Sequence, residues 1–168
     1  MTGSFINTAF LLTGGNTGNR LQHLITAKQY IGEYCGLVAD ASSVYETAAW
    51  GLTDQPAFYN QALQLHTNMQ ADELMVMLLH IENKMGRVRT VKMGPRVIDI
   101  DILFFNDDII KTETLIIPHP WLHKRRFALM PMTEIAPQFI HPVFKKNIQE
   151  LLAICDDELP VHKITGMA

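Results

Sequence analysis

Apolar residues recur at helical spacing in two long segments of the chain. The first segment follows the polar run 16–19, which offers helix-capping side chains, and the second begins at Asp72 and closes at Gly86. Each places apolar residues three or four positions apart, so each predicted helix buries one face. The apolar positions are Leu21, Leu24, Ile25, Ile31 and Cys35 in the first helix, and Leu74, Met77, Leu78, Ile81 and Met85 in the second.

Other segments have the alternating or continuous apolar runs that are typical of β-strands. The glycine pair Gly14-Gly15 is predicted to end the first strand, and two short helices are predicted near the C-terminus. One of these helices is interrupted by Pro131. The predicted strands are 5–12, 37–47, 58–67 and 97–105, with short ones at 109–111 and 115–117, and the late helices are 127–135 and 148–155.

The order of these elements predicts the fold class. Strand, helix, strand, strand, helix and strand follow one another, and short connections imply hairpins in a mostly antiparallel sheet. We therefore predict an α+β protein with a ferredoxin-like core, in which helices pack on the sheet in α/β/α layers. The chain has no internal repeat or obvious linker, so residues 1–168 are predicted to form a single domain.

The segment 92–105 places two carboxylates inside an apolar run. In an extended strand, one face holds Val97, Asp99, Asp101, Leu103 and Phe105, and the other holds Ile98, Ile100, Ile102 and Phe104. Two carboxylates on one face repel each other, and each loses hydration beside hydrocarbon. A bound cation removes both penalties, and oxygen ligands suit Mg²⁺. With Arg96 just upstream, the pattern predicts a site for a metal and a nucleotide, with Asp99 and Asp101 as metal ligands.

Composition narrows the class of protein. Of 168 residues, 48% are apolar and 18% are charged, which excludes a disordered chain and favours a compact domain. The net charge of −3 gives no reason to expect nucleic-acid binding. Eight of the fourteen Lys and Arg residues, however, fall in the segments 84–96 and 124–126. Beside the carboxylate pair these clusters predict a polyanion site, although a solvated loop is the alternative for either cluster alone.

The cysteines and the N-terminal run bear on the compartment. Cys35 and Cys155 each lie near the end of a helical pattern, which favours buried free thiols over a disulfide. Residues 5–12 are too short to cross a membrane and lack the basic region that precedes a signal peptide. We therefore expect a cytoplasmic protein that does not associate with a membrane.

A longer set of residues resembles one enzyme family. The run Gly94-Pro95-Arg96-x-x-Asp99-Ile100-Asp101-Ile102-Leu103 is similar to the signature of the 6-hydroxymethyl-7,8-dihydropterin pyrophosphokinases of folate biosynthesis. An Asp-x-Asp pair occurs in many metal enzymes, so the ordered set of motifs carries the resemblance. The further motifs are Gly14-Gly15-Asn16, Tyr45-Glu46-Thr47, Phe58-Tyr59-Asn60, Gly86-Arg87-Val88-Arg89, Pro118-His119-Pro120, Arg125, Phe127 and Ile135-Ala136-Pro137.

The resemblance implies a reaction and its cofactor. Diphosphate would pass from ATP, the co-substrate, to the hydroxymethyl oxygen of the pterin, and AMP would be released. Two Mg²⁺ ions would be held by Asp99 and Asp101. Coordination to a metal would lower the pKa of the substrate hydroxyl, so one alternative is that no dedicated base acts, and Asp99 is the candidate if one does. Phosphoryl transfer needs mainly alignment and charge neutralisation, which such a site provides. The expected partners are these small molecules, and the expected state is a monomer.

The resemblance also implies which residues contact the nucleotide. Arg87 and Arg96 match phosphate-binding arginines, and Arg89 lies in the loop between them. Arginine suits this role because its planar guanidinium binds phosphate oxygens in pairs. The other matching positions are Glu82, Ile102, His119 and Arg125. From the pattern alone, an exposed helical glutamate is the alternative for Glu82, and a structural turn residue is the alternative for His119.

A pterin needs a flat slot with hydrogen-bonding groups along one edge. The amide of Asn60 can donate and accept at that edge. Phe127 matches the stacking aromatic of the family, and Phe58 occupies a neighbouring aromatic position, for which a core phenylalanine is the alternative. Backbone groups of the segment Thr47–Trp50 are implied to complete the edge.

The chain departs from the common pattern of the family in four places, one of which is the pair Ala48 and Ala49. Gly15 stands where serine is frequent, and Ala48 and Ala49 replace prolines, which predicts a less rigid loop on the pterin side. Trp50 occupies a position that is usually aliphatic, and Met93 occupies one where an aromatic often closes over the pterin. The sequence leaves open whether Trp50 or Met93 completes the aromatic sandwich.

Two other functions fit the carboxylate pair. A different Mg²⁺-dependent transferase could use Asp99 and Asp101 to hold a nucleotide diphosphate such as a nucleotide sugar. A binding module without catalysis could hold a pterin or a nucleotide. Retention of the metal and arginine positions argues against the second alternative.

Overall fold

Strand β1 (Asn7–Gly15) is the centre of the fold. It pairs antiparallel with β4 (Phe58–Thr67) on one side and with β5 (Asp99–Phe105) on the other, and its last seven residues are buried. Gly14 and Gly15 are the last two residues of this strand, which therefore ends three residues beyond the predicted end at Leu12. They serve a close approach of neighbouring chain segments instead of a turn. The computed structural model describes residues 4–49, 54–88 and 94–165.

The rest of the main sheet is built on the free edge of β4. Strands β2 (Leu37–Ala41) and β3 (Tyr45–Thr47) both pair with β4, and β8 (Val161–Lys163) pairs with β3. The strand order is β5-β1-β4-β3-β8, with β2 beside β4. The predicted strand 37–47 is therefore two strands. Strand β8 was not predicted, because three residues are too few to show an alternating pattern.

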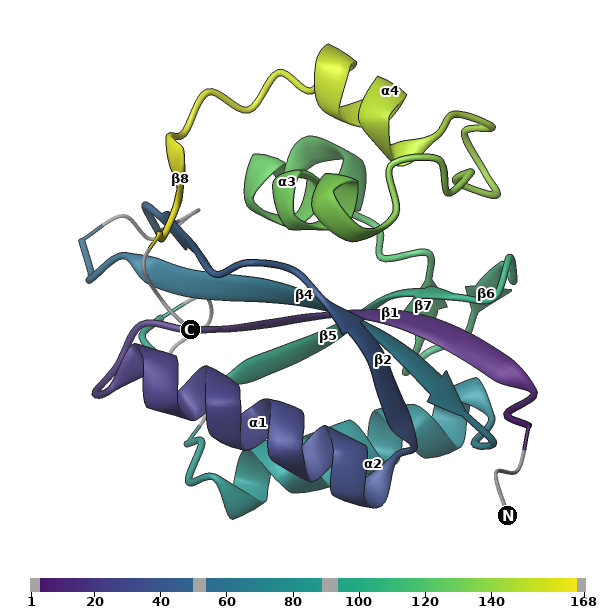
Figure 1. Ribbon diagram of the computed structural model, residues 1–168, viewed down its shortest axis with the longest axis horizontal. Helices are drawn as coiled ribbons and strands as arrows, with labels where there is room; N and C mark the ends of the chain where they lie inside the picture. The colour runs from purple at the N-terminus through teal and green to yellow at the C-terminus, as the bar shows by residue number, and fades with distance from the viewer. Residues whose placement is uncertain (1–3, 50–53, 89–93, 166–168) are drawn as a thin grey trace.

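Helices cover both faces of this sheet (Figure 1). Helices α1 and α2 lie on one face, and α3 lies on the other with α4 packed against it. The antiparallel sheet and its α/β/α layering confirm the predicted α+β class. The helices are α1 (Arg20–Tyr34), α2 (Ala71–Lys84), α3 (Arg126–Ile135) and α4 (Ile148–Ile154), and a hairpin of β6 (Ile110–Lys111) and β7 (Ile116–Ile117) and a 3-10 turn η1 (Leu122–Lys124) connect β5 to α3.

The two layers of helices create two apolar cores, one on each face of the sheet. The core under α1 and α2 is the larger, and its fully buried members include Leu11, Leu24, Ile31, Leu65, Leu74 and Ile81. The core under α3 includes Phe10, Leu12, Leu103, Phe104, Leu129 and Met132. Burial on both faces explains why β1 and β5 read as nearly continuous apolar runs.

Strand β5 contains a β-bulge, after which the alternation of its side chains between the two faces of the sheet is reversed. Residues of β1 pair with Ile102 and then with Phe104, which leaves Leu103 as an extra residue. Beyond the bulge, Phe104 packs in the core under α3 and Phe105 in the core under α1 and α2. The predicted faces were right for the two aspartates and wrong for Phe104 and Phe105, because a strict alternation does not allow for an inserted residue.

Local signals set the helix ends. Asn19 accepts a hydrogen bond from the Gln22 amide at 3.1 Å and caps α1, as the polar run predicted. The predicted interruption of α3 at Pro131 was wrong, since the helix continues through it to Ile135. The proline removes a single backbone donor, whose loss the packed helix tolerates.

The cysteines are free thiols in the part of the chain that the structure describes. Cys35 is buried, as predicted, and burial raises the pKa of its thiol to about 11, whereas Cys155 is only half-buried. No described helix is long and apolar enough to cross a membrane.

Candidate functional site

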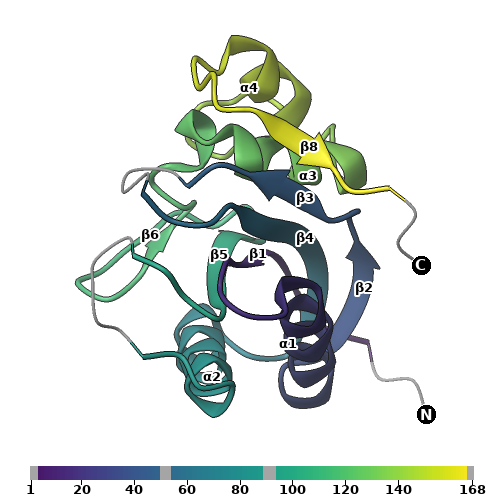
Figure 2. The same cartoon turned by 90° about the vertical axis from the view of Figure 1, so that its left-hand side faces the viewer.

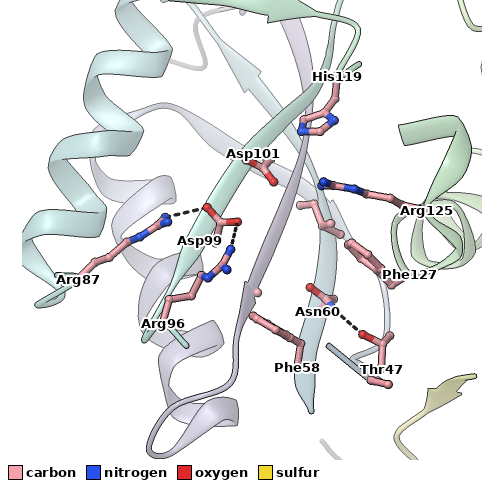
Figure 3. Close-up of a pocket in the computed structure, with 13 residues that line it drawn as sticks. Thr47, Phe58, Asn60, Arg87, Arg96, Asp99, Asp101, His119, Arg125 and Phe127 are labelled. Atoms are coloured by element: carbon pink, nitrogen blue, oxygen red, sulfur yellow. Dashed lines mark hydrogen bonds and ion pairs between the residues drawn. The ribbon is translucent and has the colours of Figure 1, made fainter. Parts of the chain in front are cut away.

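A cavity of about 270 Å³ opens where β1, β4 and β5 approach the start of α3 (Figure 3). The fold brings together ten residues that the sequence predicted for the site, although they come from distant parts of the chain. They are Thr47, Phe58, Asn60, Arg87, Arg96, Asp99, Asp101, His119, Arg125 and Phe127. Gly14 and Ala48, from the segments expected on the pterin side, also line the cavity, and so does Leu12, which was not predicted.

Two arginines hold the first carboxylate of the pair. The Arg87 guanidinium lies 2.7 Å from Asp99 Oδ1, and the Arg96 guanidinium lies 3.3 Å from Asp99 Oδ2. Arg96 also donates to the Gly94 carbonyl oxygen at 2.7 and 2.9 Å, which fixes the direction of its side chain. Both arginine side chains are largely buried, at 10% and 17% exposure. Each charge is therefore neutralised within the protein and is only partly screened by water.

The second carboxylate is in the opposite situation. Burial raises the pKa of Asp101 to about 8, and the neighbouring charges on Asp99 and Glu82 act in the same direction, against Arg125 and Arg87. Among the described residues, none donates a hydrogen bond to this carboxylate. Within the same residues, no group of three or more His, Cys, Asp or Glu side chains could hold a metal. Asp99 and Asp101 are therefore the donors available here, and one or two carboxylates are what Mg²⁺ takes from proteins.

Glu82 supports this charged region from behind. It is 2% exposed, accepts a hydrogen bond from the Ile100 amide at 2.7 Å and lies 3.0 Å from the Arg87 guanidinium. The alternative of an exposed helical glutamate is therefore wrong. Burial opposes the charge on Arg87, but Asp99 and Glu82 outweigh it and raise the pKa of that guanidinium. Glu82 thus links α2 to β5 and holds Arg87 beside the carboxylates.

His119 and Arg125 close the cavity on the side of α3. The His119 Nδ1 accepts a hydrogen bond from the Trp121 amide at 3.2 Å, which favours the neutral ring with its proton on Nε2. Burial lowers the pKa of His119 to about 4, and the Arg125 charge acts in the same direction. Burial also lowers the pKa of Arg125, against the attraction of Asp101 and Asp99. His119 therefore serves as a neutral hydrogen-bonding group, whereas Arg125 stays a cation at neutral pH.

A second cavity of about 280 Å³ adjoins the first across the carboxylate pair. Asp99, Asp101 and His119 line both cavities. Glu82 and Ile102, two predicted nucleotide contacts, line only the second one, beside apolar residues of α2 and the β6–β7 hairpin. The site is therefore a pair of pockets that share a charged wall.

The other end of the first cavity is neutral and flat. Asn60 is 4% exposed, and its amide donates to the Thr47 hydroxyl at 3.4 Å. A side chain at Gly14 would collide with Asn60 Oδ1, so glycine is needed here for the amide to reach this position. Figure 3 shows Phe58 and Phe127 on either side of Asn60. The arrangement provides one hydrogen-bonding amide between two aromatic rings.

Each of these rings is also the partner of an arginine. The Arg96 guanidinium carbon lies 5.2 Å from the centre of the Phe58 ring, and the Arg125 guanidinium carbon lies 5.6 Å from the centre of the Phe127 ring. Cation–π contacts at these distances are favourable and orient both groups. The phosphate-binding candidates and the aromatic slot are thus mechanically connected.

Asn16 is a site residue whose role the sequence did not reveal. Its side chain accepts from the Arg96 amide at 2.9 Å and donates to the Pro56 carbonyl and to Gln55 Oε1, each at 2.9 Å. It thereby joins the segment before β5 to the segment before β4. A side chain at the adjacent Gly15 would collide with the Val97 carbonyl oxygen, so the serine frequent at this position would not fit this backbone.

Three residues of the sequence prediction lie outside the described residues. They are Trp50 and Arg89, which were predicted to contact pterin and nucleotide, and Met93, which was considered for the aromatic sandwich.

Comparison with known proteins identifies one family. The family model described as 7,8-dihydro-6-hydroxymethylpterin-pyrophosphokinase matches residues 10–137. The 2-amino-4-hydroxy-6-hydroxymethyldihydropteridine pyrophosphokinase of Aquifex aeolicus is 38% identical over 85% of this chain and 89% of its own length. The protein of the same name from Bacillus subtilis is 41% identical over 79% of this chain and 80% of its own length. These matches do not favour either alternative function.

Larger proteins contain a similar region. The folic acid synthesis protein FOL1 of Dictyostelium discoideum is 40% identical over 81% of this chain, which spans only 20% of that protein. Among solved structures, the wild-type HPPK-DHPS of Plasmodium falciparum aligns with a TM-score of 0.71 at 19% identity. That alignment covers 88% of this chain and 44% of the longer one, and it confirms the fold.

Proposed function

The chain belongs to the 7,8-dihydro-6-hydroxymethylpterin-pyrophosphokinase family, and we propose that its two adjoining cavities hold the two substrates of the reaction. It is a diphosphotransferase of folate biosynthesis, which uses ATP and hydroxymethyldihydropterin. One observation carries the placement of the substrates: Asp99, Asp101 and His119 line both cavities. The diphosphate that passes between the substrates belongs at this shared wall.

The pterin occupies the neutral end of the first cavity. Its rings lie between Phe58 and Phe127, and its polar edge faces the Asn60 amide and the Thr47 segment. The support is the position of Asn60, which is buried, held by Thr47 and free of steric conflict only because Gly14 faces it. In this orientation the hydroxymethyl group points toward Asp99 and Asp101, since these lie at the other end of the same cavity.

The nucleotide occupies the second cavity, with its phosphates on the shared wall. Its base would contact Ile102, and its sugar and phosphates would run past His119, whose neutral ring can donate from Nε2. Glu82 would support the site without touching the ligand, because it is buried and already bonded to Ile100 and Arg87.

The carboxylate pair fits two Mg²⁺ ions. Asp101 is half-buried, has a raised pKa and receives no hydrogen bond from a described residue, so a cation would restore its charged form. When bound, the ions would neutralise phosphate charge and orient the phosphate chain. With Asp101 in the charged form that the ions would restore, the charges of the protein groups at the site balance one another, so the phosphate charge of ATP would be neutralised by the two ions. The balanced groups are Glu82, Asp99 and Asp101 against Arg87, Arg96 and Arg125.

The arginines then exchange partners. Without ligand, Arg87 and Arg96 neutralise Asp99. If Asp99 held a metal, both guanidinium groups would be available to bind phosphate oxygens in pairs. Arg125 approaches from the opposite side, above Phe127, and stabilises the charge that leaves with AMP.

The bond changes follow from this placement. The hydroxymethyl oxygen attacks the β-phosphorus, and the bond from that phosphorus to the oxygen it shares with the α-phosphate breaks. The bridging oxygen leaves with AMP, and the hydroxyl proton passes to Asp99, the candidate base, and from there to water. Two phosphates are thereby joined to the pterin in one step.

We further propose that the enzyme acts as a cytoplasmic monomer. The catalytic candidates Arg87, Arg96, Asp99 and Asp101 meet within one chain, which supports a monomer. Free thiols at Cys35 and Cys155 suit a reducing compartment, where ATP is also available.

Calorimetry of the wild-type chain tests the placement. 6-Hydroxymethylpterin and a non-hydrolysable ATP analogue should each bind, and the analogue should bind at least about tenfold more weakly once EDTA removes Mg²⁺. AMP should appear only when ATP and pterin are both present. Tighter binding of a nucleotide sugar than of the ATP analogue, or ADP as the nucleotide product, would contradict the proposal.

A further inference from the structure

The chain continues beyond the region that the family model matches. That match ends at residue 137, and the structure goes on through α4 to β8. We call residues 156–165 the C-terminal strap. In Figures 1 and 2 this segment, drawn in yellow, runs from α4 past α3 to the edge of the sheet beside β3. Helix α3 and strand β3 both carry residues that line the pterin end of the cavity.

The first contact of the strap is at the beginning of α3. Arg125 occupies the N-cap position, but no side-chain hydrogen bond from that position caps the helix. Asp157 supplies the bond instead, because its Oδ2 accepts from the Arg126 amide at 3.0 Å, while its Oδ1 accepts from the Leu159 amide at 3.0 Å. A carboxylate at a helix start satisfies an unpaired amide and favours the helix dipole. Phe127 lies in the helix turn that this bond holds.

The second contact is with the strand that carries Thr47. Val161 pairs with Thr47 in the β3–β8 ladder, and the Ile164 amide donates to the Val44 carbonyl at 2.8 Å. The strap therefore joins the start of α3 to β3. These are the two elements that present Phe127 and Thr47 to the same cavity.

A separate bond fixes the other end of α3 to β3. The Tyr45 hydroxyl donates to Glu134 Oε1 at 2.7 Å, and the Ser43 amide donates to Glu134 Oε2 at 2.8 Å. With its C-terminal end held in this way, α3 can vary its distance from β3 mainly at its N-terminal end. That end is where Asp157 binds.

We propose that Asp157 is a positioning residue for the pterin site, which sets the distance between the Phe127 ring and the Thr47–Asn60 edge. This role rests on the proposed function. The proposal assigns a role to residues beyond the family match. The C-terminal strap must be bound to α3 and β3 before the space between Phe127 and the Thr47–Asn60 edge has the width of a pterin. Arg125 is the N-cap residue of the same helix and directly precedes the amide that Asp157 binds.

Two substitutions at Asp157 and one elsewhere test this role. Asp157→Ala removes the acceptor, and loss of a helix cap should weaken 6-hydroxymethylpterin binding about fivefold, because the ligand must then reorder the first turn of α3. Asp157→Asn keeps an oxygen that can accept from Arg126 and should restore most of the affinity. Glu150→Ala is the matched control, since it removes the reciprocal cap of α4, which lies outside both cavities.

The measurements are calorimetric binding of 6-hydroxymethylpterin in the presence of the ATP analogue and Mg²⁺, and amide hydrogen exchange at residues 126–129. We expect weaker pterin binding and faster exchange in Asp157→Ala alone, with a smaller change in affinity for the ATP analogue. Equal pterin affinity in wild type and Asp157→Ala, equal losses in Asp157→Ala and Glu150→Ala, or no recovery in Asp157→Asn would each overturn the role. A wild-type chain that binds no pterin would overturn the proposed function itself, which is a different result.

Discussion

The two ends of the first cavity are held in different ways. At the phosphate end, Arg87 and Arg96 pair with Asp99, so charged groups satisfy one another until a ligand arrives. At the pterin end, Asn60 is fixed by Thr47 and by the space above Gly14, and its bonds do not have to be exchanged. The phosphate end must therefore be rearranged by its ligand, whereas the pterin end is already formed.

This difference predicts which step each end controls. Rearrangement of buried ion pairs is costly unless new charges replace them, so the phosphate end should act only when metal and nucleotide are both present. A preformed slot lowers the free-energy cost of binding. Changes at the pterin end should therefore alter pterin affinity more than the rate of AMP formation.

The largest expected effect is at the carboxylate with the raised pKa. Asp101→Asn removes a metal ligand and should slow AMP formation by at least about 100-fold, while pterin affinity changes little. Steady-state AMP release and pterin calorimetry check both parts. Asp107→Asn, in the exposed turn after β5, is the matched control and should behave as wild type. A fall in pterin affinity as large as the fall in rate would remove the distinction between the two ends.

The next effect belongs to the pterin end. Asn60→Ala removes a buried amide that faces the ligand edge and should weaken pterin binding by about tenfold to thirtyfold, with nucleotide affinity retained. Gln61→Ala is the control, because the Gln61 side chain bonds to the Ser42 carbonyl at 2.8 Å and is not in the cavity lining. A main effect of Asn60→Ala on turnover at saturating pterin would show that this end also acts in the chemical step.

A smaller effect is expected where one side chain supports both ends. Asn16→Ala should weaken pterin and nucleotide binding by about fivefold each, because it releases both Pro56 and Arg96. Asn16→Asp keeps the acceptor for the Arg96 amide but places a carboxylate oxygen against the Pro56 carbonyl. It should therefore weaken pterin binding more than nucleotide binding. Identical profiles for the two variants in paired titrations would argue against separate support of the two ends.

The smallest effect is on stability as pH changes without ligands. The pKa of Asp101 is raised in the folded state to about 8. Its contribution to the free energy of unfolding is therefore complete at low pH and is lost as pH rises toward 8. His119 and His141 have pKa values lowered to about 4 by burial, so they destabilise the fold below about pH 6.5 instead. Above about pH 6.5 the Asp101 effect therefore dominates, and the free energy of unfolding should fall as pH rises to 8.5.

Urea unfolding at several pH values checks this slope. Asp101→Asn should remove the decline above pH 6.5, and Asn60→Ala should keep it. A slope that persists in Asp101→Asn would place the titrating group elsewhere.

The sequence was a good guide where a pattern is local. The strand 58–67 was predicted with its observed bounds, and the shared face of Asp99 and Asp101 followed from simple alternation. The resemblance added residues that no periodicity would have selected, such as His119 and Arg125. Their approach to the carboxylates depends on the turn after β7, which no local pattern describes.

The misses depend on contacts between distant parts of the chain. The bulge at Leu103 moves two phenylalanines to opposite cores, and only the pairing with β1 reveals it. Gly14 and Gly15 resemble a turn in sequence, yet they are strand residues that make room for Asn60 and Val97. Asp157 caps a helix that begins 31 residues earlier, and no local motif connects them.

The fate of one oxygen atom tests the central claim most directly. ATP that carries a heavy oxygen isotope at the bridge between its α- and β-phosphates should be incubated with the chain, Mg²⁺ and 6-hydroxymethyl-7,8-dihydropterin. The masses of the products should then be measured by mass spectrometry. Attack on the β-phosphorus at the shared wall predicts that all of the label leaves with AMP and that the pterin gains two phosphates. Label retained on the pterin product, or a pterin that carries a single phosphate, would contradict the account.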